Sequence, residues 1–457
     1  MIYFIYIVNY FILIYFVISV MIYTILLIYA SPLIVKFFFR AKYTNVCSLL
    51  KSKVLPPVTV LTPMYNEAFR IRESVLSILN SEYTNLYVIL INDASTDSTV
   101  EFLRDEFDMV EKPLIFPQTI KTSPVKTIYI SRKYPRLMLI DKEHGGAGDS
   151  LNVGINACFT PYFATIDADS TLDKLAMSEL MFELLAEPYA VSIGGAVYVR
   201  NACEFKDGIM IQSKLPYQVV PALQANEYLR SHLFNRTGWN KFGSTMSYSG
   251  TATIFNTAAV RAVGGFDIHN FAQDADIIMR LHIDLHNKKQ KYQILFNPSA
   301  LVWTDVPSTL KLFAIQRDKW QRGLLRSVIN NKQLFFNAKY KIQGLLSYPV
   351  FIFLEILAPI VEFTAYIFLP LSYYLGILDG TSAILYMLLA WGFTAYLTMV
   401  NAFINVITFG CYQKMSDVFW VCLLAIIEMF GFRQYLTLVK IYGTIHYIIN
   451  RIRGKPL

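Results

Sequence analysis

VTVLTPMYNE, residues 58–67, opens with a short run of apolar and β-branched residues and ends in two polar ones. LYVILI at 86–91, FATI at 163–166 and Val191–Val199 are further apolar runs of strand length. Ser74–Leu79 lies in a stretch of helical periodicity between the first two runs. Strands that alternate with helices are typical of an α/β domain with a mostly parallel sheet.

Polar side chains follow three of these runs. Asn66-Glu67, Asn92-Asp93 and Asp167-Ala-Asp169 each come directly after or close behind a predicted strand. Taken singly, such a residue is often a turn or a helix cap. Because ligands of open α/β sheets bind beyond the carboxyl ends of the strands, the three together predict one site. Carboxylates beside a diphosphate favour a hard cation, Mg²⁺ or Mn²⁺.

The sequence lacks the motifs of several other kinds of site. Gly145-Gly-Ala-Gly148 is not followed by the Gly-Lys-Ser/Thr of a phosphate-binding loop, and no GxGxxG follows the first strand. No His/Cys cluster has zinc spacing. The five cysteines, at 47, 158, 203, 411 and 422, form no CxxC pair and no disulfide framework.

The first 40 residues predict a transmembrane anchor. Residues 1–35 contain no charged side chain, and this run exceeds the roughly 20 residues that a spanning helix needs. The positive charges come after the apolar core rather than before it, which is unlike a cleaved signal peptide. They are Lys36, Arg40, Lys42, Lys51 and Lys53. We expect this basic flank to be cytoplasmic.

A second apolar block, at 344–449, predicts a C-terminal transmembrane bundle. Its segments are Leu345–Ile377, Gly380–Gln413 and Val418–Gly443. Glu355 and Glu362, seven residues apart, either hydrogen-bond within the bundle or line a polar path through the membrane. The basic C-terminal end at 451–455 also prefers the cytoplasm, which requires a hairpin either in the last segment or at Pro359. The number of spans stays open.

The composition agrees with a membrane protein. The chain of 457 residues is 54% hydrophobic and only 16% charged, which excludes intrinsic disorder and a small disulfide scaffold. The formal charge is 41 − 33 = +8. Much of the Lys/Arg excess lies in the flanks at 36–53 and 451–455, where anionic lipid is the natural partner. We therefore expect no nucleic-acid partner.

Seven motifs in order carry a resemblance to a known family. They are PMYNE (63–67), INDASTDST (91–99), GGAGDSLN (145–152), IDADS (166–170), GGFD (264–267), QDAD (273–276) and QRDKW (316–320). Together they resemble the family 2 glycosyltransferases, and more narrowly the membrane-embedded processive synthases of cellulose, chitin, hyaluronan and poly-N-acetylglucosamine. TDVPST (304–309) and FGFRQY (430–435) are most similar to the bacterial poly-N-acetylglucosamine synthases.

This resemblance implies a fold and a domain order. A Rossmann-like GT-A domain at 54–306 would lie on the cytoplasmic side of the plasma membrane. The N-terminal anchor at 1–40 would precede it, and an interface helix at 307–335 and the bundle at 344–449 would follow. Ser308 or Thr309 would cap the interface helix, which has Leu310, Phe313 and Leu324 at helical spacing.

The resemblance also implies roles for single residues. Asp274 matches the catalytic base, and Asp169 matches the ligand of the metal on the diphosphate. The other matched positions are substrate-binding: Glu67 and Asp93 near the nucleoside, Asp167 on the donor side, Ser249 and Gly250 at the acceptor, and Gln316, Arg317, Lys319 and Trp320 at the channel mouth.

Three positions depart from the family pattern. Asn92 stands where the first Asp of a pair is usual, and Ala147 stands where many relatives have a Lys. Lys319 replaces the motif's Arg, which keeps the charge but loses the bidentate fork. Arg317 or Arg322 is placed to supply that fork.

The leading hypothesis is a processive, inverting synthase. It would polymerise a β-linked polysaccharide from a UDP-sugar, with UDP-GlcNAc favoured, and thread the product across the bilayer. A small accessory membrane subunit is a possible further partner. Two alternatives stay open: a non-processive enzyme that glycosylates a lipid at the membrane surface, and a non-catalytic scaffold of a synthase.

Overall fold

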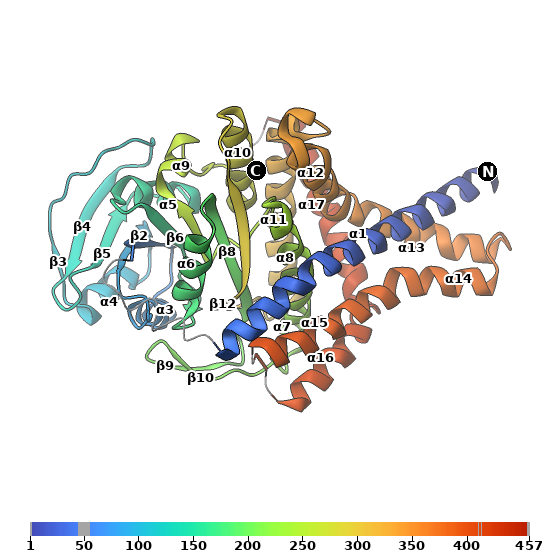
Figure 1. The fold of residues 1–457 in the computed structure, drawn as a ribbon, viewed down its shortest axis with the longest axis horizontal. Coiled ribbons are helices and arrows are strands. Elements are labelled where there is room, and N and C mark those ends of the chain that lie inside the picture. The colour runs from blue at the N-terminus through green and yellow to red at the C-terminus, as the bar shows by residue number, and fades with distance from the viewer. Residues whose placement is uncertain (1, 44–54, 410, 413, 455–457) are drawn as a thin grey trace.

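The computed structural model describes residues 2–43, 55–409, 411–412 and 414–454. The expected flank residues Lys51 and Lys53, together with Cys47 and Lys455, lie outside this part. A sheet domain, a layer of helices beside it and a splayed helical bundle follow one another along the long axis (Figure 1).

The core of the domain is a ten-stranded sheet in the order β3-β4-β5-β2-β1-β6-β11-β8-β12-β7. From one edge to the other the strands are Met109–Glu111, Val125–Ser131, Leu137–Lys142, Leu86–Asp93, Val58–Met64, Tyr162–Thr165, Thr253–Asn256, Ala190–Val199, Gln293–Thr304 and Ser170–Leu172.

The predicted strands at 58–62, 86–91, 163–166 and 191–199 are confirmed as β1, β2, β6 and β8. The main strands have the expected parallel direction: β5, β2, β1 and β6 pair in parallel, and so do β8 and β12. Antiparallel pairing occurs at β11, between β6 and β8, and at β3, β4 and β7 toward the two edges. β11 (TIFN) begins three residues after Gly250 in a short apolar stretch, but nothing in that stretch indicates the direction of the strand.

Helices cover both faces of the sheet. α3 (Ile71–Leu79), α4 (Thr99–Glu106) and α6 (Ala176–Ala186) share one apolar core with it. α5 (Ala147–Ala157), α7 (Val219–Arg230), α9 (Thr257–Ala262) and α10 (Gln273–Asn287) share the other. Buried apolar side chains on both faces fix the strand order, so the carboxyl ends of β1, β2 and β6 meet at one edge.

A layer of helices lies between the sheet and the bundle. α11 (Leu310–Asn330) begins after Thr309, whose hydroxyl accepts the Leu312 N–H at 3.3 Å, so the predicted cap at this position is confirmed. α17 (Phe432–Ile452) runs beside α11, and Gln321 donates to Thr444 at 3.1 Å. α7 continues into a π-helix, η1 (Ser231–Arg236).

The membrane segments are long, apolar helices. In the part of the chain that the structure describes, Ile2–Arg40 of α1 and Gly380–Asn405 are each long and apolar enough to cross a membrane. Two bent helix pairs make up to four spans: Gln343–Ile356 with Ala358–Tyr374, bent by 43°, and Met415–Ile427 with Phe432–Ile452, bent by 61°. The helices therefore bend both just before Pro359 and within the last segment.

These spans are assembled from several helices. They are α1 (Ile2–Tyr43), η5 (Gln343–Ser347), α12 (Tyr348–Phe351), η6 (Ile352–Ile356), α13 (Ala358–Tyr374), α14 (Gly380–Met387), η7 (Leu388–Gly392), α15 (Phe393–Phe409), α16 (Met415–Ile427) and α17.

The predicted basic flank ties the anchor to the sheet domain. Arg40, which is buried, pairs with both Glu179 and Glu183 of α6, and Lys36 lies 3.1 Å from Glu183. The Arg40 guanidinium also stacks over Phe37 and Phe182. Because a buried charge is costly without its partner, this contact fixes how α1 meets the domain.

Candidate active site

A large cavity opens at the carboxyl ends of β1, β2 and β6. Its volume is ≈ 830 Å³, and helices of the interface layer and the bundle form its other walls. Ten of the eleven predicted site residues line it: Glu67, Asp93, Asp167, Asp169, Ser249, Gly250, Asp274, Gln316, Arg317 and Trp320. The structure thus brings together residues that are up to 253 positions apart in the chain.

Lys319 is the exception. It is exposed and is not among the lining residues, whereas Gln316 and Trp320, four positions apart on α11, share the face toward the cavity. A side chain at 319 points about 100° away from Trp320 around the helix axis. The substrate-binding role of Lys319 therefore stays a prediction without support from this geometry.

The IDADS segment places two carboxylates on the cavity. β6 ends at Thr165, and β7 begins at Ser170, so the chain bends between them. The Asp167 N–H donates to the Thr251 hydroxyl at 3.3 Å, which holds the bend. Asp169 accepts from the hydroxyls of Ser170 and Thr304, each at 3.3 Å. Both carboxylates face the cavity, as expected for a bend after the strand.

The carboxylates at this end outnumber the cations beside them: among the described residues, Arg70 lies 4.0 Å from Glu67 and Arg236 acts on Asp274. Burial and the charge of Asp169 raise the pKa of Glu67 to about 7. Burial and the charge of Asp305 raise the pKa of Asp169, and burial with the charge of Asp169 raises that of Asp167. Crowded carboxylates with raised pKa values are a marker of functional sites. We call Glu67, Asp167, Asp169 and Asp274 the open carboxylates.

The donor set at this site fits a divalent cation bound together with a diphosphate. The ligands offered are carboxylate oxygens, which suit Mg²⁺ or Mn²⁺. Within the described residues no three His, Cys, Asp or Glu side chains converge on a metal position. Asp169 would therefore hold the ion with few protein partners, and phosphate oxygens would complete its shell.

Asp93 has a different environment. Lys142, with 0% side-chain exposure, pairs with Asp93 and lies 2.9 Å from Asp149. The backbone N–H groups of Gly145 and Gly146 donate to the two Asp93 oxygens, each at 2.9 Å. Burial alone would raise the pKa of Asp93, but these partners hold it below its usual value. We call Asp93 and Asp149 the closed carboxylates.

Sequence analysis missed Lys142 and what it does. Asp93 and Lys142 are register partners on β2 and β5, which places the ammonium beneath the GGAG turn. A cation is therefore present near Ala147 although Ala147 itself offers none. The signal that was available is a Lys at the end of an apolar run, LMLIDK at 137–142.

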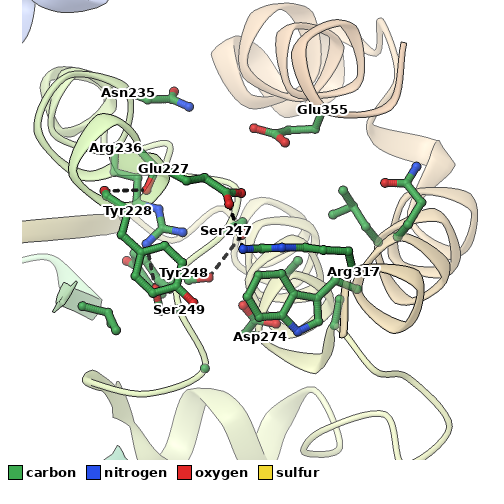
Figure 2. A pocket seen from close by; sticks show the side chains of 18 of the residues that line it. Glu227, Tyr228, Asn235, Arg236, Ser247, Tyr248, Ser249, Asp274, Arg317 and Glu355 are labelled. Carbon is green, nitrogen blue, oxygen red and sulfur yellow. Dashed lines mark hydrogen bonds and ion pairs between the residues drawn. The ribbon is translucent and has the colours of Figure 1, made fainter. Parts of the chain in front are cut away.

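Asp274 stands in the first turn of α10. Burial raises the pKa of its carboxyl to about 6, although its own helix N–H groups and Arg236 oppose this. The side chain faces the cavity that Ser247 and Trp320 also line, and Figure 2 shows it with Ser247. A partly buried carboxylate with such a pKa is suited to take a proton near neutral pH.

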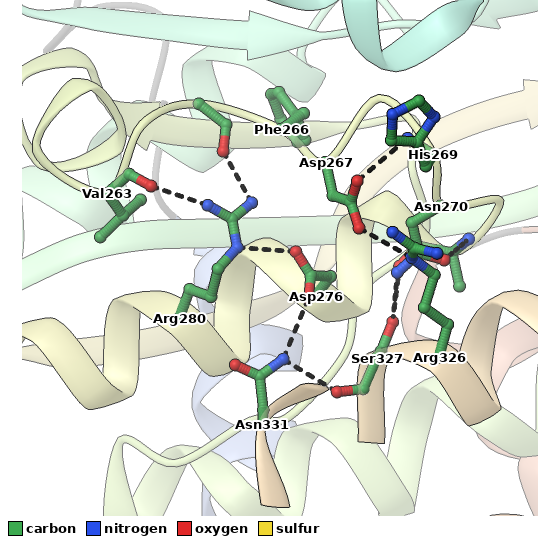
Figure 3. Close-up of polar contacts among 12 residues, drawn as sticks. Val263, Phe266, Asp267, His269, Asn270, Asp276, Arg280, Arg326, Ser327 and Asn331 are labelled. Atoms are coloured by element: carbon green, nitrogen blue, oxygen red, sulfur yellow. Dashed lines mark hydrogen bonds and ion pairs between the residues drawn. The ribbon is translucent and has the colours of Figure 1, made fainter. Parts of the chain in front are cut away.

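A polar network behind Asp274 fixes α10 (Figure 3). Arg280 donates to Asp276 at 2.7 Å and to the carbonyls of Val263 and Gly265 at 2.8 and 2.6 Å. Asn331, just after α11, donates to the other Asp276 oxygen at 3.0 Å. The second Asp of QDAD therefore positions the helix, while the first faces the cavity.

The same network joins the GGFD loop to α11. Asp267 pairs with Arg326 at 2.9 Å, and Asn270 donates to the Ser327 hydroxyl at 2.8 Å (Figure 3). The GGFD loop and the C-terminal part of α11, far apart in the sequence, thus support each other. These contacts set the spacing between Asp274 on α10 and Trp320 on α11.

The mouth of the cavity carries an arginine and an indole (Figure 2). Arg317 is buried, lies 2.7 Å from Glu227 and stacks over Trp320 at 4.2 Å from the ring centroid. Trp320 keeps 40% of its surface exposed. Of the two arginines placed to replace the motif's Arg, Arg317 faces the cavity, whereas Arg322 pairs with Asp318 at 2.8 Å.

The predicted acceptor loop lies on the opposite wall. Arg236, in the π-helix, donates to the Ser249 hydroxyl at 2.9 Å. The Gly250 carbonyl accepts from Thr165 on β6 at 2.8 Å. A Cβ at Gly250 would meet no atom within 4 Å, so the space above this glycine is open.

The cavity extends into the helical bundle, and both glutamates of the first C-terminal segment line it. Glu362 accepts from Arg433 at 2.5 Å and from Thr437 at 2.9 Å, so it is partnered within the bundle. Glu355 precedes the bend and has no hydrogen bond or ion pair among the described residues. The expected hydrogen bonding within the bundle thus holds for Glu362, whereas a polar path through the membrane stays a prediction.

Comparisons with known proteins agree with this architecture. The family model described as "Glycosyl transferase family 2" matches residues 59–263, and "Glycosyl transferase family group 2" matches residues 162–411. A poly-beta-1,6-N-acetyl-D-glucosamine synthase of Staphylococcus epidermidis is 25% identical over 65% of this chain and 64% of its own. The poly-beta-1,6-N-acetyl-D-glucosamine synthase of Staphylococcus aureus strain COL is 24% identical over 59% of this chain and 55% of its own. The chain thus matches less than two thirds of each relative's length.

A solved structure shares the fold. The mannosyltransferase PcManGT from Pyrobaculum calidifontis, in complex with GDP-Man and Mn²⁺, has a TM-score of 0.51 and 16% sequence identity. The match covers 88% of this chain and 98% of the other. This likeness extends across the sheet domain and the helices that follow it.

Proposed function

Because this chain belongs to glycosyl transferase family group 2, we propose that it polymerises a β-linked polysaccharide from a UDP-sugar by inverting transfer. UDP-GlcNAc is the favoured donor, since the curated relatives reported above are named as N-acetylglucosamine polymer synthases. The observation that carries the proposal is that Asp274 and the IDADS carboxylates line one cavity that continues into the bundle.

The chain's own residues supply a complete set of roles for the transfer. Asp274 takes the proton of the acceptor hydroxyl as its oxygen attacks the sugar C1 and the bond from C1 to the diphosphate breaks. Trp320 offers a flat face to the acceptor sugar. Gln316, Ser249 and the open space at Gly250 position that sugar, with Arg317 at the mouth.

The donor would lie on the opposite side of the cavity, against the sheet edge. Asp167 and Glu67 would contact its sugar and nucleoside, and Asp169 would hold Mg²⁺ or Mn²⁺. The bound ion neutralises the charge that grows on the departing diphosphate. Asp93 would act mainly by shaping the GGAG turn, because its oxygens already accept from Lys142, Gly145 and Gly146.

We further propose that the product leaves through the bundle. The membrane half of the cavity is lined by residues of α1, η6, α13, α15 and α17, and many of them are aromatic or polar: Tyr15, Ser19, Tyr23, Glu355, Glu362, Thr394, Arg433, Thr437 and Lys440. Such side chains suit a sugar chain, which has both hydroxyl edges and apolar ring faces. The sheet domain would face the cytoplasm at the plasma membrane, and a small accessory membrane subunit is a possible partner.

The test uses purified full-length protein in nanodiscs with Mn²⁺. UDP-GlcNAc, UDP-glucose and UDP-glucuronate are offered singly and in pairs, and both UDP release and product size are measured. High-molecular-mass product from UDP-GlcNAc, absent in Asp274→Asn, is expected. Short or lipid-extractable product would instead favour a lipid glycosyltransferase, and binding without turnover would favour a scaffold.

A further inference from the structure

Arg70 is the cation beside the open carboxylates at the donor end of the cavity, whereas Arg236 acts on Asp274. Arg70 is the N-cap residue of α3, just after the PMYNE segment. Its Nε lies 3.1 Å from Asp305 Oδ2, and one terminal nitrogen lies 4.0 Å from Glu67 Oε2. Among the described residues, neither Glu67 nor Asp305 has another ion-pair partner. Arg70 therefore holds these two carboxylates together.

Asp305 lies next to the predicted metal ligand. It follows β12, whose last residue Thr304 is the register partner of Ser170 on β7. Asp169 and Asp305 therefore flank the same pair of strand ends. Asp305 and Asp169 both line the cavity. The acidic residue of TDVPST was not among the residues singled out from the sequence.

The ion pair between Arg70 and Asp305 is easily broken. The Arg70 side chain is 52% exposed, and its other described side-chain contact is the long one to Glu67. Exposed ion pairs contribute little to stability because water screens them and the long side chain loses freedom. Lys142, by contrast, has no exposed surface and two buried partners. A mobile monovalent charge beside a carboxylate pair is readily exchanged for a divalent one.

Resting on the function proposed above, we propose that Arg70 is a displaceable counter-ion for the metal site. In the absence of metal, the Arg70 guanidinium pairs with the Asp305 carboxylate. When Mg²⁺ or Mn²⁺ binds at Asp169, Asp305 turns to the ion as a further ligand and Arg70 withdraws. The freed guanidinium then faces the cavity end at which a diphosphate would bind, so metal and donor cooperate.

The test measures Mn²⁺ binding by the loss of the free-ion EPR signal, with the full-length protein in detergent and no sugar donor. Arg70→Gln should bind Mn²⁺ about three- to tenfold more tightly, because one competing charge is gone. Arg72→Gln is the matched control. Two residues on, Arg72 pairs with Glu106 at 2.8 Å and Asp207 at 3.1 Å, away from the cavity, so its removal should change nothing.

The opposite change is expected at Asp305. Asp305→Asn should weaken Mn²⁺ binding about three- to tenfold, whereas Asp207→Asn should not. In the Asp305→Asn background, Arg70→Gln should no longer improve binding. Addition of UDP should narrow the gap between Arg70→Gln and the wild type, since the wild-type arginine gains a phosphate partner.

The outcomes separate this exchange from the proposed function. Mn²⁺ binding that Asp169→Asn removes but Arg70→Gln leaves unchanged or weakens would overturn the exchange alone. Mn²⁺ binding that follows the expected pattern, with no turnover of any UDP-sugar, would overturn the proposed function alone. Absence of Mn²⁺ binding from the wild type and from Arg70→Gln, with and without UDP, would overturn the exchange as well.

Discussion

Two sets of carboxylates stand at the same sheet edge in opposite electrostatic states. The closed carboxylates, Asp93 and Asp149, share the buried ammonium of Lys142, and Asp93 accepts two backbone N–H groups. Among the described residues, none of the open carboxylates pairs with a lysine; Arg70 lies 4.0 Å from Glu67, and Arg236 acts on Asp274. The pKa of Asp93 is held below its usual value, while burial raises that of Asp274 to about 6.

The contrast teaches how an Asp at a strand end is to be interpreted. Both sets follow β-strands and both belong to family motifs, so position and residue type do not distinguish them. The presence of a protein cation does. A carboxylate that a protein cation already neutralises shapes the site. A carboxylate without such a cation is available to bind a cation or a proton from solution.

The largest effect is expected in the open set. Asp274→Asn should reduce turnover about 10²- to 10⁴-fold, because no group then takes the acceptor proton. Its melting temperature should not fall, since the raised folded pKa means that the ionised carboxylate costs stability at neutral pH. Asp284→Asn, on the same helix and paired with Lys288, is the control. A large loss of stability in Asp274→Asn would break the contrast.

Lys142 should behave in the opposite way. Lys142→Met leaves two buried carboxylates without their cation and should lower the free energy of unfolding by about 3–5 kcal/mol. Lys142→Arg keeps the charge and should lose less stability than Lys142→Met. The double variant Lys142→Met/Asp93→Asn should recover part of the loss in a thermal melt. Equal stability of wild type and Lys142→Met would show that the closed set is not a structural unit.

Metal ions should distinguish the two sets directly. Mn²⁺ at one hundred times its dissociation constant should stabilise the wild type by about 2.7 kcal/mol, and chelation should reverse this. Asp169→Asn should lose the effect, while Lys142→Arg should keep it. The measurement is the melting temperature with and without Mn²⁺, followed by intrinsic fluorescence.

The smallest effect is on the pH profile. Asp274 acts as a base only when it is deprotonated, and its pKa is raised to about 6. Activity should therefore be full above pH 7 and should fall about tenfold for each pH unit below 6. Steady-state rates at saturating donor, between pH 5 and 8, measure this. A profile that stays flat down to pH 5 would place the base elsewhere.

Much of the fold could be predicted from local pattern. The apolar runs predicted β1, β2, β6 and β8, and of the two predicted helix caps, Ser308 or Thr309, the cap is Thr309. The antiparallel direction of β11 could not be predicted, because its pairing is fixed by the strands on either side of it rather than by its own four residues.

The candidate site was predicted from motif order, and its residues meet except for Lys319. What the sequence could not supply is which charges neutralise one another. The Lys142 and Arg70 contacts join residues 49 and 235 positions from their Asp partners. Such contacts depend on strand register and on the entry of one helix, which no short pattern encodes. The orientation of Lys319 likewise follows from the angle at which α11 meets the cavity.

The helix α1 has a consequence for biosynthesis. Its Asn9 amide donates to the Ser372 hydroxyl of α13 at 2.8 Å across 363 residues of chain. At roughly 5–20 residues per second, the ribosome needs roughly 20–70 s to make the partner. During that interval the Asn9 amide of α1 has to wait for this partner. The hydrogen bond that joins α1 to α13 can therefore form only late in synthesis.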